Sequence, residues 1–265
     1  MSILRVVISG PRGKMGQEAV KLTEQNEELE LVAVIDYKHK GVNVSDIVNT
    51  TQSCPVFATA EECFSQVEAD VYIDLSVREA AYPNSLAAMT AGVRPVIGAT
   101  GFTDEELATL EATANDKKLG CIVAPNFAVG AILMMKFAQM AAKHFQDVEI
   151  LELHHDQKKD APSGTAVKTA QLIQTEREGK PQGHLDEVET IAGARGADVD
   201  GMRIHSVRLP GLIAHQQVMF GASGQTLTIR HDSYDRASFM SGVHHACKVV
   251  MQLEEFVYGL ESILD

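Results

Sequence analysis

Apolar runs in the first half of the chain have the length and the boundaries of buried parallel strands. Each is short and rich in Val, Ile or Leu, and most end at a glycine, a proline or a polar residue. The runs are Leu4–Ser9, Leu29–Ile35, Val71–Leu75, Pro95–Gly98 and Gly120–Ala124. The helical stretches between them are Gln17 to about Glu24, Glu79–Ala91, and a helix whose start is signalled by Thr103–Glu106. This alternation predicts an α/β fold with a Rossmann-like, doubly wound parallel sheet.

The second half of the chain has a different pattern. Gly130–Phe145 is predicted to be a helix, with Met134, Met135 and Met140 in the core. After a strand at Val148–Leu153, the polar segment Glu176–Asp200 is expected to be a long flexible excursion. Three segments then show period-two alternation, and the last two are joined by a hairpin at Gly221–Gly224: Met202–Leu209, Ile213–Phe220 and Gln225–His231. These neighbouring strands predict a C-terminal α+β domain with an open mixed sheet.

The final helical stretch indicates how the two domains divide the chain. Ala237–Tyr258 is predicted to be one long helix that packs back on the first domain. We therefore expect a dinucleotide-binding domain of residues 1–128 with 239–265. Residues 129–238 are expected to form a second domain that binds the substrate.

Composition excludes several classes of protein. The 265 residues are 45% hydrophobic, which is typical of a soluble globular protein, and no apolar run approaches the ~20 residues that span a bilayer. No secretory leader is recognisable at the start, and the four cysteines form no C-x-x-C pair, so we expect reduced thiols, no metal site and a cytoplasmic location. The net charge of −13 argues against nucleic acid as a partner. Any site for an anionic ligand must then be locally positive.

A glycine-rich turn follows the first strand. Its residues are Gly10, Pro11, Arg12, Gly13, Lys14, Met15 and Gly16. Glycines let a backbone approach a pyrophosphate, and a helix N-terminus offers it free N–H groups. The G-x-x-G-x-x-G spacing alone also fits a turn with no ligand, but Asp36 ends the second strand about 20 residues later, where an acid binds ribose hydroxyls. Because Lys38 and Lys40 follow it, we expect NADPH or NADH as cofactor, with NADPH somewhat preferred.

Two later strand ends are expected to border the nicotinamide half of the cofactor. In a doubly wound sheet, ligands lie outside the carboxyl ends of the strands. The residues at these ends are Gly98, Ala99 and Thr100 after one strand and Ala124, Pro125, Asn126 and Phe127 after the next.

The segment after the strand at Val148–Leu153 concentrates groups that can transfer protons and bind anions. If that strand continues through His155, His154 and His155 point to opposite faces and cannot share a metal ion. Lys158 can deliver a proton, as can an imidazole near neutral pH. Ser163 is a predicted N-cap, so the N–H groups of Gly164 and Thr165 would form a site suited to a carboxylate. Cofactor, carboxylate site and proton donors together indicate a reductase.

These residues also carry a resemblance to a known family. Glu152–Ala166, which reads E-L-H-H-D-Q-K-K-D-A-P-S-G-T-A, resembles the signature of the dihydrodipicolinate (4-hydroxy-tetrahydrodipicolinate) reductases. The segments Gly10–Gly16, Val96–Phe102 and Ala124–Gly130 resemble further elements of that family.

The resemblance implies an NAD(P)H-dependent step of lysine and diaminopimelate biosynthesis. Hydride would pass to C4 of the cyclic unsaturated imine formed from a dicarboxylate substrate, with His154 and Lys158 as the proton-donating pair. His155 would contact the substrate, and Gly164 with Thr165 would hold a carboxylate. It further implies a homotetramer assembled through the sheet of the second domain. Two alternatives stay open: another two-domain dehydrogenase of amino-acid metabolism, and an NAD(P)-sensing protein without catalysis.

Overall fold

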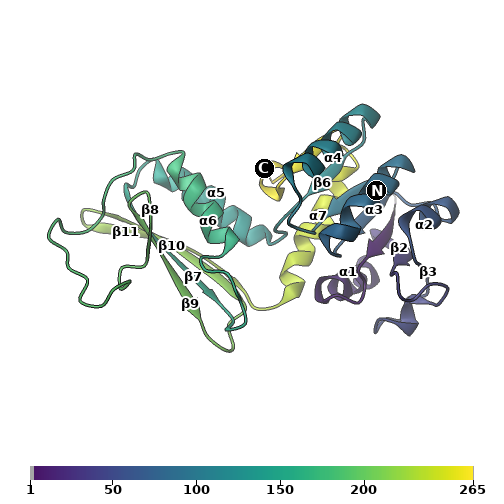
Figure 1. Cartoon of the computed structure of the whole chain (residues 1–265), viewed down its shortest axis with the longest axis horizontal. Coiled ribbons are helices and arrows are strands. Elements are labelled where there is room, and N and C mark those ends of the chain that lie inside the picture. The colour runs from purple at the N-terminus through teal and green to yellow at the C-terminus, as the bar shows by residue number, and fades with distance from the viewer. Residues whose placement is uncertain (1–2, 265) are drawn as a thin grey trace. The chain divides into compact units, whose positions relative to one another are not determined.

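The computed structural model describes residues 3–264, which form two compact units. The first draws its described residues from Met1–Ala128 and Phe239–Asp265, and the second is Val129–Ser238 (Figure 1). Among the described residues, no helix is long and apolar enough to cross a membrane.

The first unit contains a seven-stranded sheet in which all paired strands are parallel. Its order is β12-β6-β5-β4-β1-β2-β3. The strands are β1 Leu4–Ser9, β2 Leu29–Ile35, β3 Val56–Phe57, β4 Val71–Asp74, β5 Arg94–Ile97, β6 Cys121–Val123 and β12 Phe256–Tyr258. The direction of winding reverses between β1 and β4, which is the hallmark of a doubly wound sheet. The predicted Rossmann-like fold is confirmed.

Helices cover both faces of this sheet (Figure 1). One face carries α1 Lys14–Gln25 and α7 Met240–Val250, and the other carries α2 Ala60–Gln66, α3 Arg78–Thr90 and α4 Asp104–Lys117. Short 3₁₀ turns lie at η1 Val44–Asp46, η2 Arg236–Phe239 and η3 Leu260–Ser262. Thr103 caps α4 in a reciprocal capping box with Glu106, as the sequence predicts.

The second unit contains a five-stranded mixed sheet of order β11-β10-β7-β9-β8. The strands are β7 Asp147–His154, β8 Ala197–Val199, β9 Met202–Arg208, β10 Ala214–Ala222 and β11 Gln225–Ser233. The central strand β7 is parallel to β9 and antiparallel to β10. Two helices, α5 Val129–Ala142 and α6 Gly164–Gln174, cover one face (Figure 1). The predicted open mixed sheet is confirmed.

The first helix begins earlier than the sequence suggested. It starts at Lys14 and not at Gln17, because Gly13 is extended and its carbonyl accepts the N–H of Gln17 at 2.9 Å. Lys14 and Met15 therefore belong to the first helical turn and not to the loop before it.

The prediction of one helix over Ala237–Tyr258 is wrong. After η2, the helix α7 ends at Val250, and Phe256–Tyr258 is the edge strand β12, paired in parallel with β6. The aromatic and β-branched side chains of Phe-Val-Tyr favour a strand over a helix. Gly259, with φ +88°, ends the strand in a conformation that only glycine adopts readily.

The structure differs from the sequence predictions in three smaller respects. Met134 and Met135 are buried, but Met140 is 57% exposed on the outer side of α5. The hairpin strands pair as far as Ala222 and Gln225, so the connection is the two-residue turn Ser223-Gly224 and not four residues. The sequence analysis missed the short elements β3, α2 and β8.

Candidate active site

A pocket lies at the carboxyl ends of β1, β2 and β4, where the order of the strands reverses. Its volume is about 640 Å³. Predicted cofactor residues line it together with a loop from β4 that the sequence analysis did not assign: Gly10, Arg12, Gly13 and Asp36 with Leu75, Ser76 and Val77. Ligands of doubly wound sheets bind at this reversal, so the pocket has the place expected of a dinucleotide site.

The glycine turn is close-packed in a way that requires glycine at both ends. Gly10 has φ +75°, and a Cβ on it would lie 2.9 Å from the carbonyl oxygen of Leu75. A Cβ on Gly16 would lie only 2.0 Å from the carbonyl oxygen of Gly10. The turn therefore brings the start of α1 against β1, with the N-terminus of the helix at the pocket.

Asp36 is buried, and cationic and polar donors surround its carboxylate. Arg12 donates from Nε at 2.6 Å, the backbone N–H of Lys38 donates at 2.9 Å, and Nδ1 of His39 lies 2.9 Å away. Burial alone would raise the pKa of Asp36, but these hydrogen bonds outweigh it and hold the pKa below its usual value. The acid predicted to bind ribose is thus a carboxylate already neutralised by Arg12.

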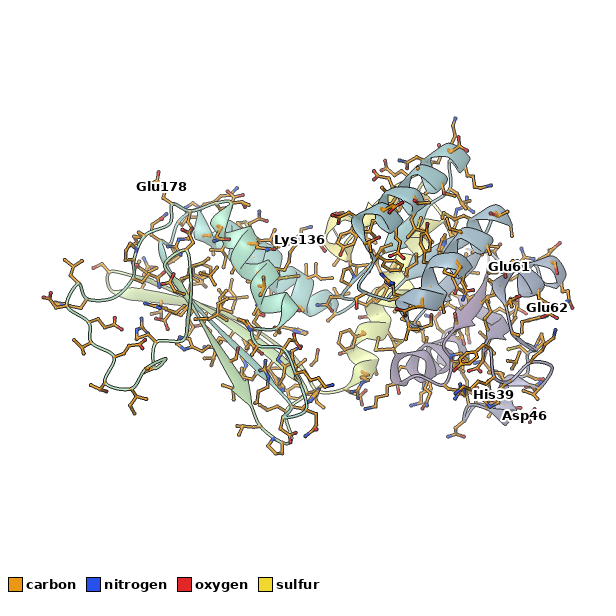
Figure 2. All side chains as sticks on the ribbon, viewed as in Figure 1. His39, Asp46, Glu61, Glu62, Lys136 and Glu178 are labelled. Carbon is orange, nitrogen blue, oxygen red and sulfur yellow. The ribbon has the colours of Figure 1, made fainter. Side chains whose placement is uncertain are left out.

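The two lysines after Asp36 are placed differently from Arg12. The ammonium of Lys38 lies 5.3 Å from the centre of the Tyr37 ring, and Lys40 forms an ion pair with Glu62 at 2.9 Å. Figure 2 shows His39 and Glu62 in this part of the first unit. Arg12 is therefore the cation that the structure brings to Asp36.

The other predicted cofactor residues lie beside this pocket and do not line it. Gly98–Thr100 follow β5 and Ala124–Phe127 follow β6, and the N–H of Ala124 donates to the carbonyl of Ile97 at 2.8 Å. A Cβ on Gly98 would lie 2.7 Å from the Leu75 side chain and 2.9 Å from the Phe127 ring. The two strand ends and the loop after β4 are thus packed together.

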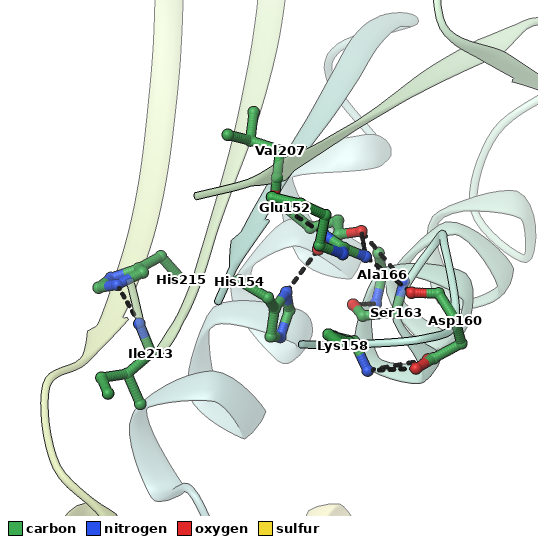
Figure 3. A network of polar contacts seen from close by, with 10 residues as sticks. Glu152, His154, Lys158, Asp160, Ser163, Ala166, Val207, Ile213 and His215 are labelled. Atoms are coloured by element: carbon green, nitrogen blue, oxygen red, sulfur yellow. Dashed lines mark hydrogen bonds and ion pairs between the residues drawn. The ribbon is translucent and has the colours of Figure 1, made fainter. Parts of the chain in front are cut away.

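In the second unit, a buried glutamate organises the loop after β7 (Figure 3). Glu152 is fully buried, and Arg208 of β9 donates two hydrogen bonds to it, at 2.7 and 2.9 Å. Nδ1 of His154 lies 2.5 Å from the same carboxylate, and the backbone N–H of Ser163 donates to it at 3.3 Å. Arg208 also donates to the carbonyl of Asp160 at 2.8 Å. One carboxylate therefore links two strands to both ends of the loop.

The cluster determines the charges of its members. Burial would raise the pKa of Glu152, but hydrogen bonds from Arg208, Ser206 and His154 hold it below its usual value. Burial lowers the pKa of His154, and the charge of Lys158 adds to this, which outweighs the opposite effect of Glu152. His154 is thus a neutral imidazole at neutral pH, and its hydrogen bond to the Glu152 carboxylate puts the proton on Nδ1.

Lys158 projects from the loop near His154, where its ammonium forms a 2.8 Å ion pair with Asp160 (Figure 3). Asp160 is exposed, so water screens this pair. The strand ends at His154, one residue earlier than the alternation argument assumed, so the direction of His155 follows from the loop and not from β7.

The helix α6 begins directly after the loop. Ser163 is its N-cap and accepts the N–H of Ala166 at 3.2 Å, as predicted. The first N–H groups of a helix have no partner within it. A Cβ on Gly164 would meet no atom within 4 Å, so this end of the helix is open. The geometry is suited to an anion.

The sequence analysis assigned no role to Glu152 or Arg208. One signal was available for Glu152: it continues the alternating buried face that Val148 and Ile150 begin, where a carboxylate requires partners. No local pattern identifies Arg208, because the pairing of β7 with β9 brings it to Glu152 from 56 residues away.

Comparison with known proteins agrees with this arrangement. Residues 4–127 match the family model described as dihydrodipicolinate reductase, N-terminus, and residues 130–264 match the model described as dihydrodipicolinate reductase, C-terminus. The chain belongs to the dihydrodipicolinate reductase family. Membership makes it an NAD(P)H-dependent oxidoreductase of lysine and diaminopimelate biosynthesis.

Individual relatives of the dihydrodipicolinate reductase family are similar over the whole chain. Proteins named 4-hydroxy-tetrahydrodipicolinate reductase from Bacillus cereus (strain B4264) and Bacillus thuringiensis (strain Al Hakam) are 59% identical over 266 residues, which is 100% of both chains in each comparison. The dipicolinate-bound reductase from Paenisporosarcina sp. TG-14 is 54% identical with a TM-score of 0.90, covering 99% of this chain and 100% of that one. An amine dehydrogenase from Mycobacterium smegmatis, 13% identical with a TM-score of 0.65 and covering 98% and 96%, shares the fold alone.

The ion pair of Arg208 with Glu152 yields a stability prediction for this reductase. Arg208→Met leaves a buried carboxylate without its main partner, which costs roughly 3 kcal/mol of unfolding free energy, the low end for broken buried pairs. The low end applies because 19% of the Arg208 side chain is exposed. Urea denaturation at pH 7 measures the loss. The pKa of Glu152 is lower in the folded state than its value of about 4.3 in the unfolded state. The ion pair therefore stabilises the folded protein fully at pH values above about 4.3. As the pH falls below about 4, the difference in unfolding free energy between the parent and Arg208→Met should shrink.

Arg230→Met is the matched control. Arg230 forms a similar ion pair with Asp232, at 2.9 Å, but 47% of the Arg230 side chain is exposed. Its removal should cost less than about 1 kcal/mol. Equal losses in the two variants would contradict a special role for the buried pair.

Proposed function

We propose that this chain reduces the dehydrated form of 4-hydroxy-tetrahydrodipicolinate to tetrahydrodipicolinate, with hydride added at C4 and with His154 and Lys158 as the proton-donating pair. The observation that carries the proposal is the cluster in which buried Glu152 holds His154 beside Lys158, directly before the open N-terminus of α6. The first unit would bind the dinucleotide, and the second would bind the substrate and mediate assembly.

The residues of the first unit fit a dinucleotide. Close packing at Gly10 and Gly16 fixes the turn against the start of α1. Gly13, which has no side chain, lines the pocket there, so a pyrophosphate can approach the backbone and the N-terminus of α1. A reduced nicotinamide cofactor supplies the hydride. Asp36 and Arg12 would face the adenosine ribose, and Gly98–Thr100 with Ala124–Phe127 would border the nicotinamide.

Dicarboxylate binding is assigned to the loop and the start of α6. Gly164 and Thr165 would donate backbone N–H groups to one carboxylate, and His155 would contact the substrate. The reductase from Paenisporosarcina sp. TG-14 was solved with dipicolinate, itself a dicarboxylate. That relative supports a site for two carboxylates here.

His154 and Lys158 would play different parts in proton transfer. His154 is neutral at neutral pH, since burial lowers its pKa, so it gives up a proton only after it receives one. Lys158 carries an ammonium with three donors and is held by a single exposed acid. We assign the source of the proton to Lys158, and the orientation and relay of the proton to His154.

Assembly into a homotetramer is proposed through the sheet of the second unit. Neither α5 nor α6 covers the sheet face to which Leu151, Leu153 and Met219 alternate. A partly apolar sheet face of this kind suits an interface between copies. A cytoplasmic location is proposed because all four cysteines are buried free thiols.

The direct test is NADPH and NADH oxidation with substrate generated in place from pyruvate and aspartate semialdehyde by the preceding synthase. Oxidation should be rapid and should depend on the synthase. Cofactor binding without oxidation would instead favour a sensing protein and overturn the proposed reaction.

Lys158→Ala tests the proton donor. Loss of a positioned acid should lower kcat by about 10²–10⁴-fold, because general acid catalysis contributes about that much. NADPH affinity, measured by fluorescence titration, should stay unchanged. Lys159→Ala is the matched control, since Lys159 is the exposed neighbour and has no assigned role. Unaltered turnover in the Lys158 variant would remove Lys158 from the mechanism.

Arg12→Ala tests the preference between cofactors. The variant removes the cation at Asp36 and leaves a carboxylate that repels the 2′-phosphate of NADPH. Its Kd for NADPH should rise by about tenfold or more, as expected for a charge-assisted hydrogen bond, while its Kd for NADH should change little. Lys40→Ala is the control, because Lys40 pairs with Glu62. An equal loss for both cofactors would show that Arg12 does not discriminate between them.

A further inference from the structure

One side of the pocket in the first unit, here called the wall, is formed by residues 75–77, and buried side chains of the core hold these residues in place. Leu75, Ser76 and Val77 follow β4 and line the pocket together with the glycine turn. They are in close contact with that turn: the N–H of Leu75 donates to the carbonyl of Ser9 at 3.2 Å, and the Cα of Ser76 would lie 3.1 Å from a Cβ on Gly10. A displacement of this wall would therefore displace the turn as well.

Asp74 fixes the wall. It is fully buried at the end of β4, and its Oδ1 accepts both the backbone N–H of Ser76 at 2.9 Å and the Ser76 hydroxyl at 2.7 Å. The backbone carbonyl of Asp74 also accepts the N–H of Gly98 at 2.7 Å. The residue thus contacts both the wall of the pocket and the segment Gly98–Thr100 assigned to the cofactor.

Tyr72 fixes Asp74. The Tyr72 hydroxyl donates to Oδ2 of Asp74, and its ring is fully buried, edge-on to Phe64 at 5.7 Å between centres. The side chains of Ser9 and Asn84, which line the pocket, also lie near the phenol. Tyr72 and Asp74 therefore form a polar cluster with Ser76 at the carboxyl end of an otherwise apolar strand.

This cluster is costly for the core. Burial raises the pKa of both Asp74 and Tyr72, because neither charged form is stable away from water. The other two residues of β4, Val71 and Ile73, are apolar and buried, so the polar pair is the exception in this strand. Through its hydrogen bonds the polar pair fixes the orientation of residues 75–77, which apolar side chains could not do.

We propose that Tyr72 and Asp74 are positioning residues for the dinucleotide, which hold residues 75–77 against the glycine turn so that the pocket is preformed before the cofactor binds. The inference rests on the proposed role of this pocket as the cofactor site. Neither residue reaches the pocket itself, so both act through Ser76 and the turn.

The test compares variants of the full-length enzyme by direct NADPH titration and by steady-state kinetics. Tyr72→Phe removes one hydrogen bond to Asp74, and its Kd for NADPH should rise by about 3- to 10-fold. Asp74→Ala removes the whole support, and its Kd should rise by about 10-fold or more. Asp74→Asn should match Tyr72→Phe, with a Kd raised about 3- to 10-fold, because its amide oxygen still accepts both Ser76 bonds but its NH2 group cannot accept the Tyr72 hydroxyl. At saturating NADPH, kcat should be unchanged in all three.

A control separates positioning from general destabilisation. Leu110→Ala creates a cavity under α4, away from the pocket, and should lower stability without changing the Kd. If Asp74→Ala does not fold, Tyr72→Phe and Ser76→Ala carry the test, and both should weaken binding.

The outcomes distinguish this inference from the proposed function. Parental Kd values in the folded variants, or a loss confined to kcat, would overturn the positioning role. Binding of NADPH by the parent without any reduction of substrate would overturn the proposed reaction, while weakened binding in the variants would still support the positioning role.

Discussion

A single buried carboxylate, that of Glu152, determines the geometry of the second unit's site. Its position on the core face of β7 excludes water, so every lone pair must find a donor within the protein. Arg208 supplies two, His154 one and Ser163 another. The consequence is that the imidazole, the start of α6 and the loop between them cannot move independently. The loop to which the chemistry is assigned thereby acquires the rigidity of the sheet.

The same arrangement recurs at the other ligand site and resolves the charge problem that the sequence raises. The chain carries a net charge of −13, yet its cofactor and substrate are anions. At Asp36 the partners are Arg12 and His39, and at Glu152 they are Arg208 and His154. Each acid that would repel a phosphate or carboxylate has a guanidinium against it. Local neutralisation at the two sites therefore matters more for binding than the overall field, which salt screens.

How well the sequence predicts a feature of this structure depends on how far apart in the sequence the interacting residues lie. The longer strands, the glycine turn, the capping of α4 and α6 and the position of Asp36 follow from local patterns, whereas the short strands β3, β8 and β12 were not predicted. Partners across the sheet do not: Arg12 reaches Asp36 over 24 residues and Arg208 reaches Glu152 over 56. The C-terminal prediction failed partly for the same reason: the side chains of Phe256–Tyr258 favour a strand locally, but the pairing with β6 that completes it is distant in the sequence. The wall after β4 was missed because its support lies in side chains of the core.

The contrast between His154 and Lys158 gives a physical basis to the proposed division of proton transfer between them. His154 stands on a strand, is mostly buried, and is bound to an acid that cannot leave. Lys158 stands on a loop, and its partner Asp160 is 61% exposed at the side chain, so exchanging that acid for a substrate group costs little free energy. A proton donor must approach its acceptor closely and withdraw afterwards, whereas an orienting group must stay still. The imidazole on the strand and the ammonium on the loop fit these two proposed roles.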